Sequence, residues 1–367
     1  MKMPVRRPSG FTLVEMLVGL AVSVILVGLT LTVLSHVSST VRNADSSIDA
    51  FQSAEAGFDI MTQKLSDATL NTYYDYDNPN LPTRYLRRSD LHFFVVQNSV
   101  LDSAVTSGTA NPNSGESVFF QVPAGYSNNT AYANTQGLLN ACGYYVEFGP
   151  NNAYWPSIFT SGTFPLHYRY RLMQAIQPTE FNDVYGDPEP GVPETSPAWI
   201  TPLVTLPSAG STQANGVASV ALPIAENVIA LVILPQSPAL VASSALSTST
   251  DYQYNSRQGF PLSNATTSAN PLAAYQSEQL PQILQLTMVA IDAASAMRLD
   301  TGSSAPPPVI EHALTTGTSP RFTQVSQYAA DLAALEASLA AAHINYQVLS
   351  TSVTLRESKW SNGSNGL

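Results

Sequence analysis

The chain has 367 residues, of which 44% are hydrophobic, so it can build a sizeable core and is too apolar for a disordered protein. Charged residues make up 11%, well below the ~25% usual in soluble domains. The formal net charge is −11, and residues 11–367 hold 12 basic and 26 acidic side chains. This acidic body argues against nucleic acid as the main partner, because phosphate binding depends on lysine and arginine.

The N-terminus carries the most specific pattern. Residues 1–10 form a short basic leader, with Lys2, Arg6 and Arg7, that ends at Gly10. Residues 11–34 follow, and 17 of these 24 are apolar. As a helix they would be about 36 Å long, enough to span a bilayer. The basic leader is expected to stay cytoplasmic while the bulk of the chain lies outside the membrane.

One acid, Glu15, interrupts the apolar span. A carboxylate in a membrane helix costs about 2.5–3.5 kcal/mol and usually has a specific role. An ordinary secretory signal peptide has a shorter apolar core, which ends in a small-residue cleavage site. A plain signal anchor would explain the span but not Gly10 and Glu15 together.

The segment Gly10-Phe11-Thr12-Leu13-Val14-Glu15 is similar to the cleavage and methylation motif of type IV prepilins and type II secretion pseudopilins. The resemblance implies that a prepilin peptidase/methyltransferase cuts after Gly10 and N-methylates Phe11. Cutting creates an ammonium group, and a buried cation needs an anion. Glu15 is therefore expected to be the charge partner of the new N-terminus, within its own chain or on a neighbouring subunit.

A second, amphipathic helical segment is expected at residues 35–72. No proline occurs between Pro8 and Pro79, so one helix is predicted from about residue 11 to about residue 70. Apolar side chains recur at steps of three and four, a helical stripe: Ile48, Phe51, Ala54, Phe58, Met61, Leu65 and Ala68. Gly19, Gly28 and Gly57 are either bending points or sites of close helix packing.

A globular β-rich head is expected at residues 73–360, and residues 361–367 are expected to be disordered. Short apolar runs predict strands at residues 91–97, 117–122, 142–148, 167–176, 227–234, 283–292 and 346–356. In the fourth run, His167, Arg169 and Arg171 alternate with apolar residues, which predicts a solvated basic face. Residues 324–343 predict a helix, with Thr323 as its N-cap. Three polar stretches, 185–202, 237–271 and 301–319, are expected to be surface insertions.

The fold class predicted from these elements is α+β. It is a pilin-like plan, with a long N-terminal α-helix packed on a mostly antiparallel β-sheet head with long loop insertions. Leu280-Pro281-Gln282-Ile283 resembles a strand entry in J-type minor pseudopilins and W-type minor pilins. The segments that begin Asn71-Thr72-Tyr73 and Leu139-Asn140-Ala141 resemble the large prepilin-like proteins called Verru_Chthon cassette protein C.

The sequence predicts no catalytic, cofactor or metal site. The five histidines have no metal-type spacing, and Glu311-His312 is interpreted as a coincidence in a loop. Asp75, Asp77, Asn78 and Asn80 could hold Ca²⁺, but a turn at the end of the long helix is the better explanation. The single cysteine, Cys142, is expected to be a small buried residue.

The predicted function is structural. We expect a minor pilin or pseudopilin-like subunit that is processed after Gly10 and assembled into a type IV pilus or a type II secretion-like pseudopilus. The alternative is a membrane-anchored tip adhesin or cargo-binding module. An enzyme is not expected. The expected partners are the peptidase, other pilin-like subunits and the inner membrane, crossed once, with the head in the periplasm or an extracellular filament.

Overall fold

A computed structural model describes residues 12–76, 80–83, 85–98, 101, 109–111, 113–132, 135–154, 165–182, 184, 199–204, 221–237, 247–248, 252–257 and 278–358. The chain divides into two compact units, Met1–Asp49 and Ala50–Leu367. Helix α1 runs from Leu13 to Ser66, as the proline-free stretch predicted, and ends shortly before the expected position near residue 70. The N-terminal leader and the C-terminal tail lie outside the described residues.

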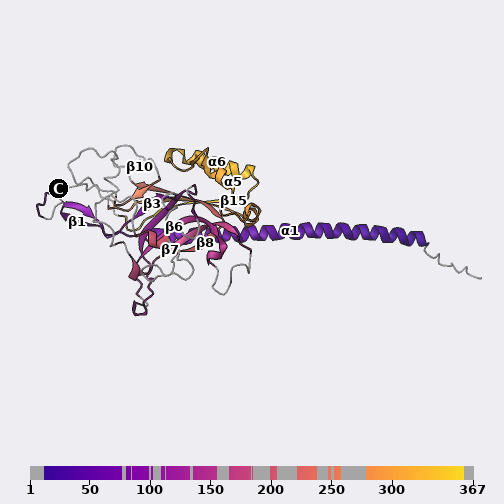
Figure 1. The fold of residues 1–367 in the computed structure, drawn as a ribbon, viewed down its shortest axis with the longest axis horizontal. Helices are drawn as coiled ribbons and strands as arrows, with labels where there is room; N and C mark the ends of the chain where they lie inside the picture. The colour runs from indigo at the N-terminus through magenta and orange to yellow at the C-terminus, as the bar shows by residue number, and fades with distance from the viewer. Residues whose placement is uncertain are drawn as a thin grey trace, which may run out of the picture. The chain divides into compact units, whose positions relative to one another are not determined.

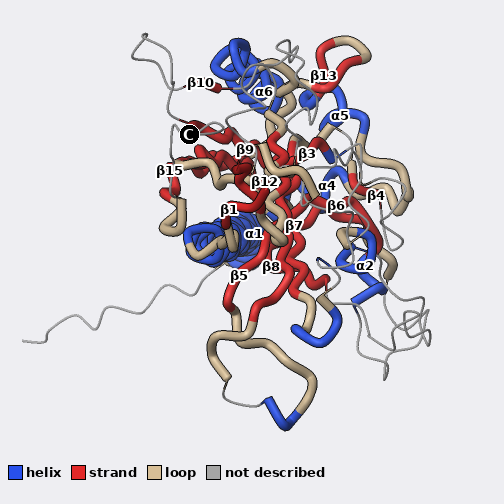
Figure 2. Tube along the Cα trace, turned by 90° about the vertical axis from the view of Figure 1, so that its left-hand side faces the viewer, coloured by secondary structure: helices blue, strands red, loops and turns tan. Residues whose placement is uncertain are grey.

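Two antiparallel sheets form the framework of the second unit (Figures 1 and 2). The larger sheet has the order β11-β3-β5-β6-β7-β8, with β4 paired to β6, and the smaller has the order β10-β9-β12-β15. The strands of the larger sheet are β3 (Phe94–Gln97), β4 (Thr109–Ala110), β5 (Glu116–Pro123), β6 (Leu139–Pro150), β7 (Tyr168–Ile176), β8 (Ala221–Glu226) and β11 (Tyr254–Asn255). Those of the smaller sheet are β9 (Val228–Ser237), β10 (Ser247–Thr248), β12 (Ile283–Ile291) and β15 (Tyr346–Thr354).

Two hairpins and several short helices complete the unit. The hairpins are β1 (Tyr73–Tyr76) with β2 (Tyr85–Arg88), and β13 (Thr315–Thr316) with β14 (Ser319–Pro320). The helices are α2 (Thr201–Val204), α4 (Ala293–Leu299), α5 (Pro308–Leu314) and α6 (Tyr328–Ala341). The 3₁₀ turns are Thr130–Tyr132, Asn151–Tyr154, Thr179–Phe181 and Val325–Gln327. Figure 2 shows the strands gathered at the centre and α2, α5 and α6 outside them.

Both faces of the larger sheet are buried. One face packs against the smaller sheet and against α1 residues Ala54, Phe58, Met61 and Leu65, which are at most 6% exposed. The other face packs against residues 199–204. Gly57 lies against β8, where an added Cβ would stand 3.0 Å from the Ala225 Cβ atom, so the close-packing interpretation is confirmed at this glycine.

All seven predicted strands are confirmed, with end shifts of a few residues. The pilin-like α+β architecture, a long N-terminal helix followed by mostly antiparallel sheets, is likewise confirmed. These strands were predictable from the sequence because each run contains enough apolar residues to bury at least one face of the strand.

The solvated basic face predicted for β7 is wrong at Arg171, whereas the His167 side chain is 42% exposed. Arg171 is 1% exposed and lies across from Glu147 on β6, with 3.8 Å between the Arg171 Nη1 and Glu147 Oε1 atoms. Met173, two residues further on and therefore on the same face of the strand, packs in the cluster that includes residues 199–204. A segment distant in the sequence covers this face, so the arginine is buried beside its acidic partner.

All three expected surface insertions also contribute to the core. The 237–271 stretch contains strand β11 and the buried Tyr252 and Tyr254. Residues 301–319 contain α5, which starts at Pro308, a favoured first helical position. Its Ile310, Ala313 and Leu314 are buried. Trp199 and residues near it fill the core at the end of the 185–202 stretch. Thr323 does not cap a helix: the residue before α6 is Gln327, with no side-chain cap hydrogen bond.

A polar seam joins the two sheets. Gly115 pairs with Leu231 of β9 in an isolated parallel bridge, and its φ of 94° favours glycine. An added Cβ there would lie 2.2 Å from the Leu231 carbonyl oxygen. Beside it, the fully buried Glu116 accepts a hydrogen bond from the Ile233 backbone N–H at 3.0 Å. Burial raises the pKa of Glu116 well above its ordinary value, so the neutral acid is favoured.

This seam gives the first prediction. Because the folded-state pKa of Glu116 is raised, its contribution to stability is complete below the unfolded pKa and is lost as pH rises through the folded value. Glu116→Gln keeps an acceptor and cannot ionise, so its unfolding temperature should exceed that of wild type by a margin that grows from pH 4 to pH 8. Glu116→Ala should lose about 1–3 kcal/mol at pH 4, because it leaves a buried N–H unpaired. Parallel pH profiles for wild type and Glu116→Gln in thermal unfolding would contradict this.

Candidate processing and assembly site

The start of α1 is held by a reciprocal pair of hydrogen bonds between Thr12 and Glu15. The Glu15 backbone N–H donates to the Thr12 Oγ1 atom at 3.3 Å, and the Thr12 N–H donates to Glu15 Oε2 at 3.4 Å. This is the capping box of the pattern Thr-x-x-Glu, in which two helix-terminal donors are satisfied. The negative charge also lies in the first turn, where the helix dipole favours it.

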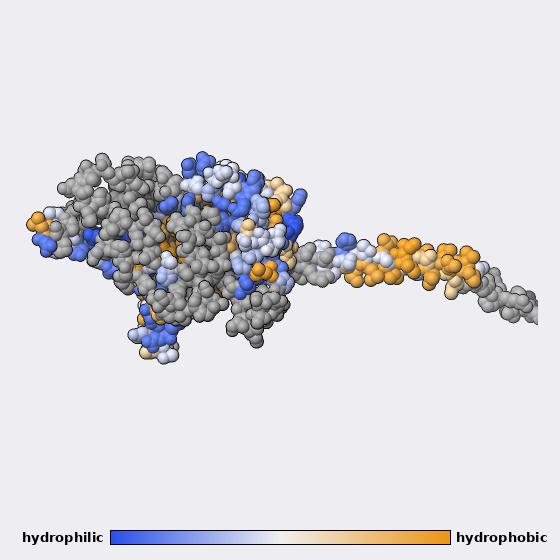
Figure 3. Space-filling model, viewed as in Figure 1, coloured by the Kyte–Doolittle hydropathy of each residue, from blue (hydrophilic) through white to orange (hydrophobic). Residues whose placement is uncertain are grey.

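The helix that follows has an uncovered apolar surface. From Leu13 to Leu34, each large apolar side chain is between 50% and 79% exposed. Leu13–Ser38 is the one helix among the described residues that is long and apolar enough to cross a membrane, with a mean hydropathy of 2.6. Figure 3 shows this stretch as an orange, apolar surface.

The hydroxyl groups of this helix are bonded to its own backbone. Ser23 donates to the Gly19 carbonyl at 2.8 Å, Thr30 to that of Leu26 at 3.0 Å and Thr32 to that of Gly28 at 2.9 Å. Such bonds remove the cost of placing a polar group in an apolar environment. Glu15 is the one charged side chain in residues 11–34, and its carboxylate oxygen is directed back to the helix start.

Of the predicted processing residues, Glu15 is the one that the described part of the chain contains. Gly10 and Phe11 lie outside the described residues, whereas Glu15 lies in the first turn. The Phe11 nitrogen is separated from the Thr12 nitrogen by two backbone atoms of Phe11. Glu15 thus accepts a hydrogen bond from the backbone N–H of the residue that directly follows Phe11 in the sequence.

Comparison with protein-family models identifies the motif at this N-terminus. Residues 5–31 match the prokaryotic N-terminal methylation motif. The chain thus has a type IV prepilin-like N-terminus, which implies processing by a prepilin peptidase, and its helix indicates a membrane-anchored, pilin-like protein. Pilin-like proteins are a structural and generally non-enzymatic family. Comparisons with curated proteins and with solved structures found no significant match.

The structure describes some of the residues that the sequence analysis considered as metal ligands or reactive side chains. Within the described ranges, no group of three His, Cys, Asp or Glu residues could hold a metal ion. Asp77 and Asn78 of the calcium hypothesis lie outside those ranges, and Asp75 lies in β1, a strand that the sequence did not predict. Cys142 is buried in β6, as expected, and burial raises the pKa of its thiol to about 12.

Glu311 is a structural anchor that the sequence analysis missed. Its carboxylate accepts hydrogen bonds from the Tyr170 hydroxyl at 2.9 Å and from the Asn113 side chain at 2.5 Å, and it also contacts Asn111. These bonds tie α5 to β7 and to the loop before β5. The adjacent His312 takes no part in them and is exposed.

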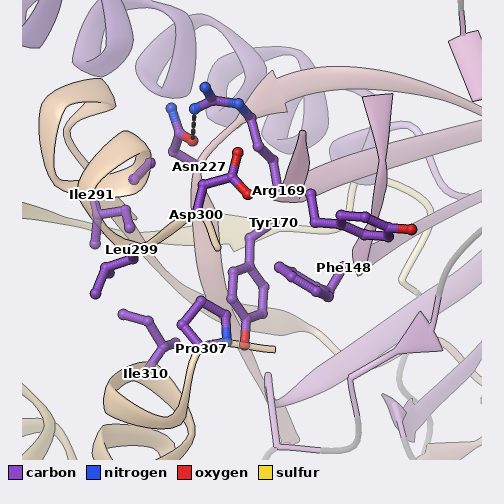
Figure 4. A pocket seen from close by; sticks show the side chains of 11 residues that line it. Phe148, Arg169, Tyr170, Asn227, Ile291, Leu299, Asp300, Pro307 and Ile310 are labelled. Carbon is purple, nitrogen blue, oxygen red and sulfur yellow. Dashed lines mark hydrogen bonds between the residues drawn. The ribbon is translucent and has the colours of Figure 1, made fainter. Parts of the chain in front are cut away.

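A small aromatic cavity lies beside this anchor (Figure 4). Phe148 and Tyr170 line one side, and Leu299 and Ile310 the other. Its volume of about 20 Å³ is little more than a water molecule needs. It is therefore a packing gap and too small for a ligand.

The capping box gives the second prediction. In the uncleaved chain in detergent, Thr12→Ala removes the side-chain acceptor of the cap and should destabilise the first turn of α1 by about 1 kcal/mol. The backbone N–H of Glu15 should then exchange with solvent roughly five-fold faster. Hydrogen exchange followed by NMR measures this. Thr12→Ser is the matched control, since it keeps the hydroxyl and should retain protection. Equal exchange in the Ala and Ser variants would rule out the capping role.

Proposed function

We propose that this chain is a minor pilin or pseudopilin-like structural subunit, cleaved after Gly10 and N-methylated on Phe11. The observation that carries the proposal is the methylation motif together with an exposed apolar helix whose first turn contains Glu15, hydrogen bonded to Thr12. An exposed apolar surface of this length requires cover from lipid or from other apolar helices. A membrane before assembly and a filament core after it supply that cover in turn.

Glu15 has two roles in this proposal. Before cleavage, its carboxylate closes the capping box with Thr12. After cleavage, the ammonium of Phe11 becomes its charge partner, on its own chain or on the subunit above or below. Pairing between subunits would also set the axial register, because an unpaired charge in an apolar helix bundle is costly.

The remaining features of the proposal follow from the motif. The peptidase and other pilin-like subunits are the partners, the leader is cytoplasmic, and the head is periplasmic or part of an extracellular filament. A membrane-anchored adhesin or cargo-binding module is the second candidate. It is favoured by a cavity on the head, lined by both polar and apolar side chains, that the structural role does not use.

Processing gives the third prediction. When the chain is co-expressed with a prepilin peptidase, mass spectrometry should find a mature N-terminus at Phe11 that carries one methyl group. Gly10→Val should retain residues 1–10, because the residue at the cut must be small. Ser9→Ala is the control and should be processed normally. A mature Gly10→Val protein that starts at Phe11 would overturn the assigned cut.

The fourth prediction separates the two roles of Glu15. Glu15→Gln keeps the side-chain acceptor of a capping box but has no charge, whereas Glu15→Ala loses both. Both variants should be cleaved, and both should show at least a ten-fold loss of incorporation into filaments, measured by immunoblotting of sheared or pelleted assemblies. Normal incorporation of Glu15→Gln would show that capping suffices and that the charge pair is not needed.

A further inference from the structure

The smaller sheet ends in an open edge at β15. This strand pairs with β12 on one side, and no strand that the structure describes pairs with its other side, which we call the outer edge of β15. β15 is nine residues long, whereas a typical strand has about five or six. Figure 2 shows β15 at the left-hand side of the strands.

The hydrogen bonds to β12 determine which backbone groups face the outer edge. At one end of the pair, the Asp292 N–H donates to the Asn345 carbonyl at 3.1 Å, and at the other end the Leu355 N–H donates to the Gln282 carbonyl at 3.1 Å. In an antiparallel pair, residues bonded to the neighbouring strand alternate with residues that face away from it. The odd-numbered residues of β15 therefore bond to β12. The even-numbered residues present their N–H and C=O groups to the outer edge: Tyr346, Val348, Ser350, Ser352 and Thr354.

The next even-numbered residue supports this assignment. The Arg356 N–H faces away from β12 and donates to the Ser66 carbonyl at the end of α1, at 3.1 Å. The end of α1 thus closes the edge just beyond β15. Within β15, no hydrogen bond joins an outward-facing backbone group to another residue that the structure describes. Ser350, Ser352 and Thr354 are exposed, so a further strand can reach this part of the edge.

The outer edge of β15 lacks the features that normally prevent a sheet from adding strands. Edge strands are usually short, or they carry charges, a proline or a bulge. β10 and β11 are two residues long, and β8 contains Pro223 and Glu226 and has a register shift against β7. β15 contains no charged residue and no proline, and it keeps one register with β12 along its whole length. Its outer edge therefore presents a regular row of backbone donors and acceptors to a further strand.

The side chains along this edge favour an uncharged strand. The C-terminal half of β15 carries the small, exposed hydroxyl side chains of Ser350, Thr351, Ser352 and Thr354. Side chains directly opposite on paired strands lie about 4.5–5.5 Å apart. A charged side chain on an added strand would find no opposite charge in β15. Small and β-branched uncharged side chains fit such an edge.

A second copy of this chain is disfavoured as the occupant, and this step rests on the proposed filament role. Two copies that pair through the same edge form a closed dimer with two-fold symmetry, whereas a filament joins one patch of a subunit to a different patch of the next. The other edge strands of the two large sheets, β8, β10 and β11, are short or protected. The added strand is therefore expected from a different protein.

We propose that the outer edge of β15 binds an extended, uncharged strand of a different protein in the same assembly. That strand becomes a fifth strand of the smaller sheet, which has four of its own. In strand addition of this kind, main-chain hydrogen bonds supply the affinity and alternate side chains supply the specificity. Here the five outward-facing residues of β15 form the main-chain bonds, and the small side chains beside them select against charged segments.

The proposal is tested on the uncleaved, full-length protein in detergent, so the result does not depend on processing or filament formation. The probe is an end-capped, uncharged peptide with the sequence of residues 345–355, which can pair its own even-numbered residues with those of β15. Calorimetry should detect binding. In hydrogen exchange followed by NMR, the peptide should slow exchange of the Ser350 and Ser352 amides at least ten-fold. The Leu349 and Thr351 amides, which bond to β12, should be protected with or without the peptide.

Two pairs of matched reagents isolate the backbone contact. Ser352→Pro removes an outward-facing N–H that β12 does not use and should weaken peptide binding at least ten-fold, whereas Ser352→Ala keeps the N–H and should bind like wild type. The same peptide N-methylated at its residues 348, 350 and 352 should not bind to the wild-type protein. This second comparison decides the question if Ser352→Pro fails to fold. A peptide with glutamate at its residues 348 and 352 should bind at least ten-fold more weakly.

Several results would overturn the proposal. Strand addition would be wrong if the peptide did not bind, if the N-methylated peptide bound equally well, or if Ser352→Pro and Ser352→Ala had equal affinity. Equal binding of the glutamate peptide would contradict the preference for an uncharged strand. Protection of the Ser350 and Ser352 amides in the free monomer would show that another segment of the chain covers the edge. A dimer in sedimentation that Ser352→Pro dissociates would identify a second copy as the occupant.

Discussion

The structure depends on one apolar surface: the side chains of α1 from Leu13 to Leu34, which are not covered by the part of the chain that the structure describes. Burying a side chain of this type stabilises by about 1.5–3 kcal/mol, so the helix strongly favours lipid or other apolar helices. Its hydroxyl groups are bonded to its own backbone, and its one charge is bonded to its first turn. The helix can therefore pass from lipid to a bundle of like helices without exposing a polar group.

The head, unlike this helix, contains buried polar groups. It buries several polar groups whose partners come from another part of the chain: Glu116 with the Ile233 backbone, Arg171 with Glu147, and Tyr170 with Glu311 of α5. Buried polar pairs are costly when broken, because the remaining group cannot reach water. They fix how sheets and helices are arranged, while the apolar contacts supply most of the stability. The rigid framework leaves the β1–β2 hairpin and the outer edge of β15 on the surface.

The N-terminal motif, the long helix and the seven main strands were predictable because their signals are local. An apolar run such as residues 283–292 needs no knowledge of its neighbours to be assigned as a strand. The burial of Arg171 was not predictable, since it depends on residues 199–204 and on Glu147. The short strands β1 and β11 were missed for a related reason: their residues are polar or aromatic, and pairing rather than apolar alternation defines them. The Thr12–Glu15 capping box was also predictable, because its Thr-x-x-Glu spacing is local.

The central claim is that residues 13–38 are covered in the cell, and cysteine accessibility tests it most directly. The native Cys142 is buried in the folded protein but would react after denaturation, so both variants carry Cys142→Ala and the thiol reagent reports on the introduced cysteine alone. Val24→Cys and Tyr132→Cys are treated with a membrane-impermeant maleimide in membranes and filaments, then again after denaturation. The account predicts that Val24→Cys reacts only after denaturation, whereas Tyr132→Cys reacts at once. Equal labelling of both cysteines in native membranes and filaments would contradict it.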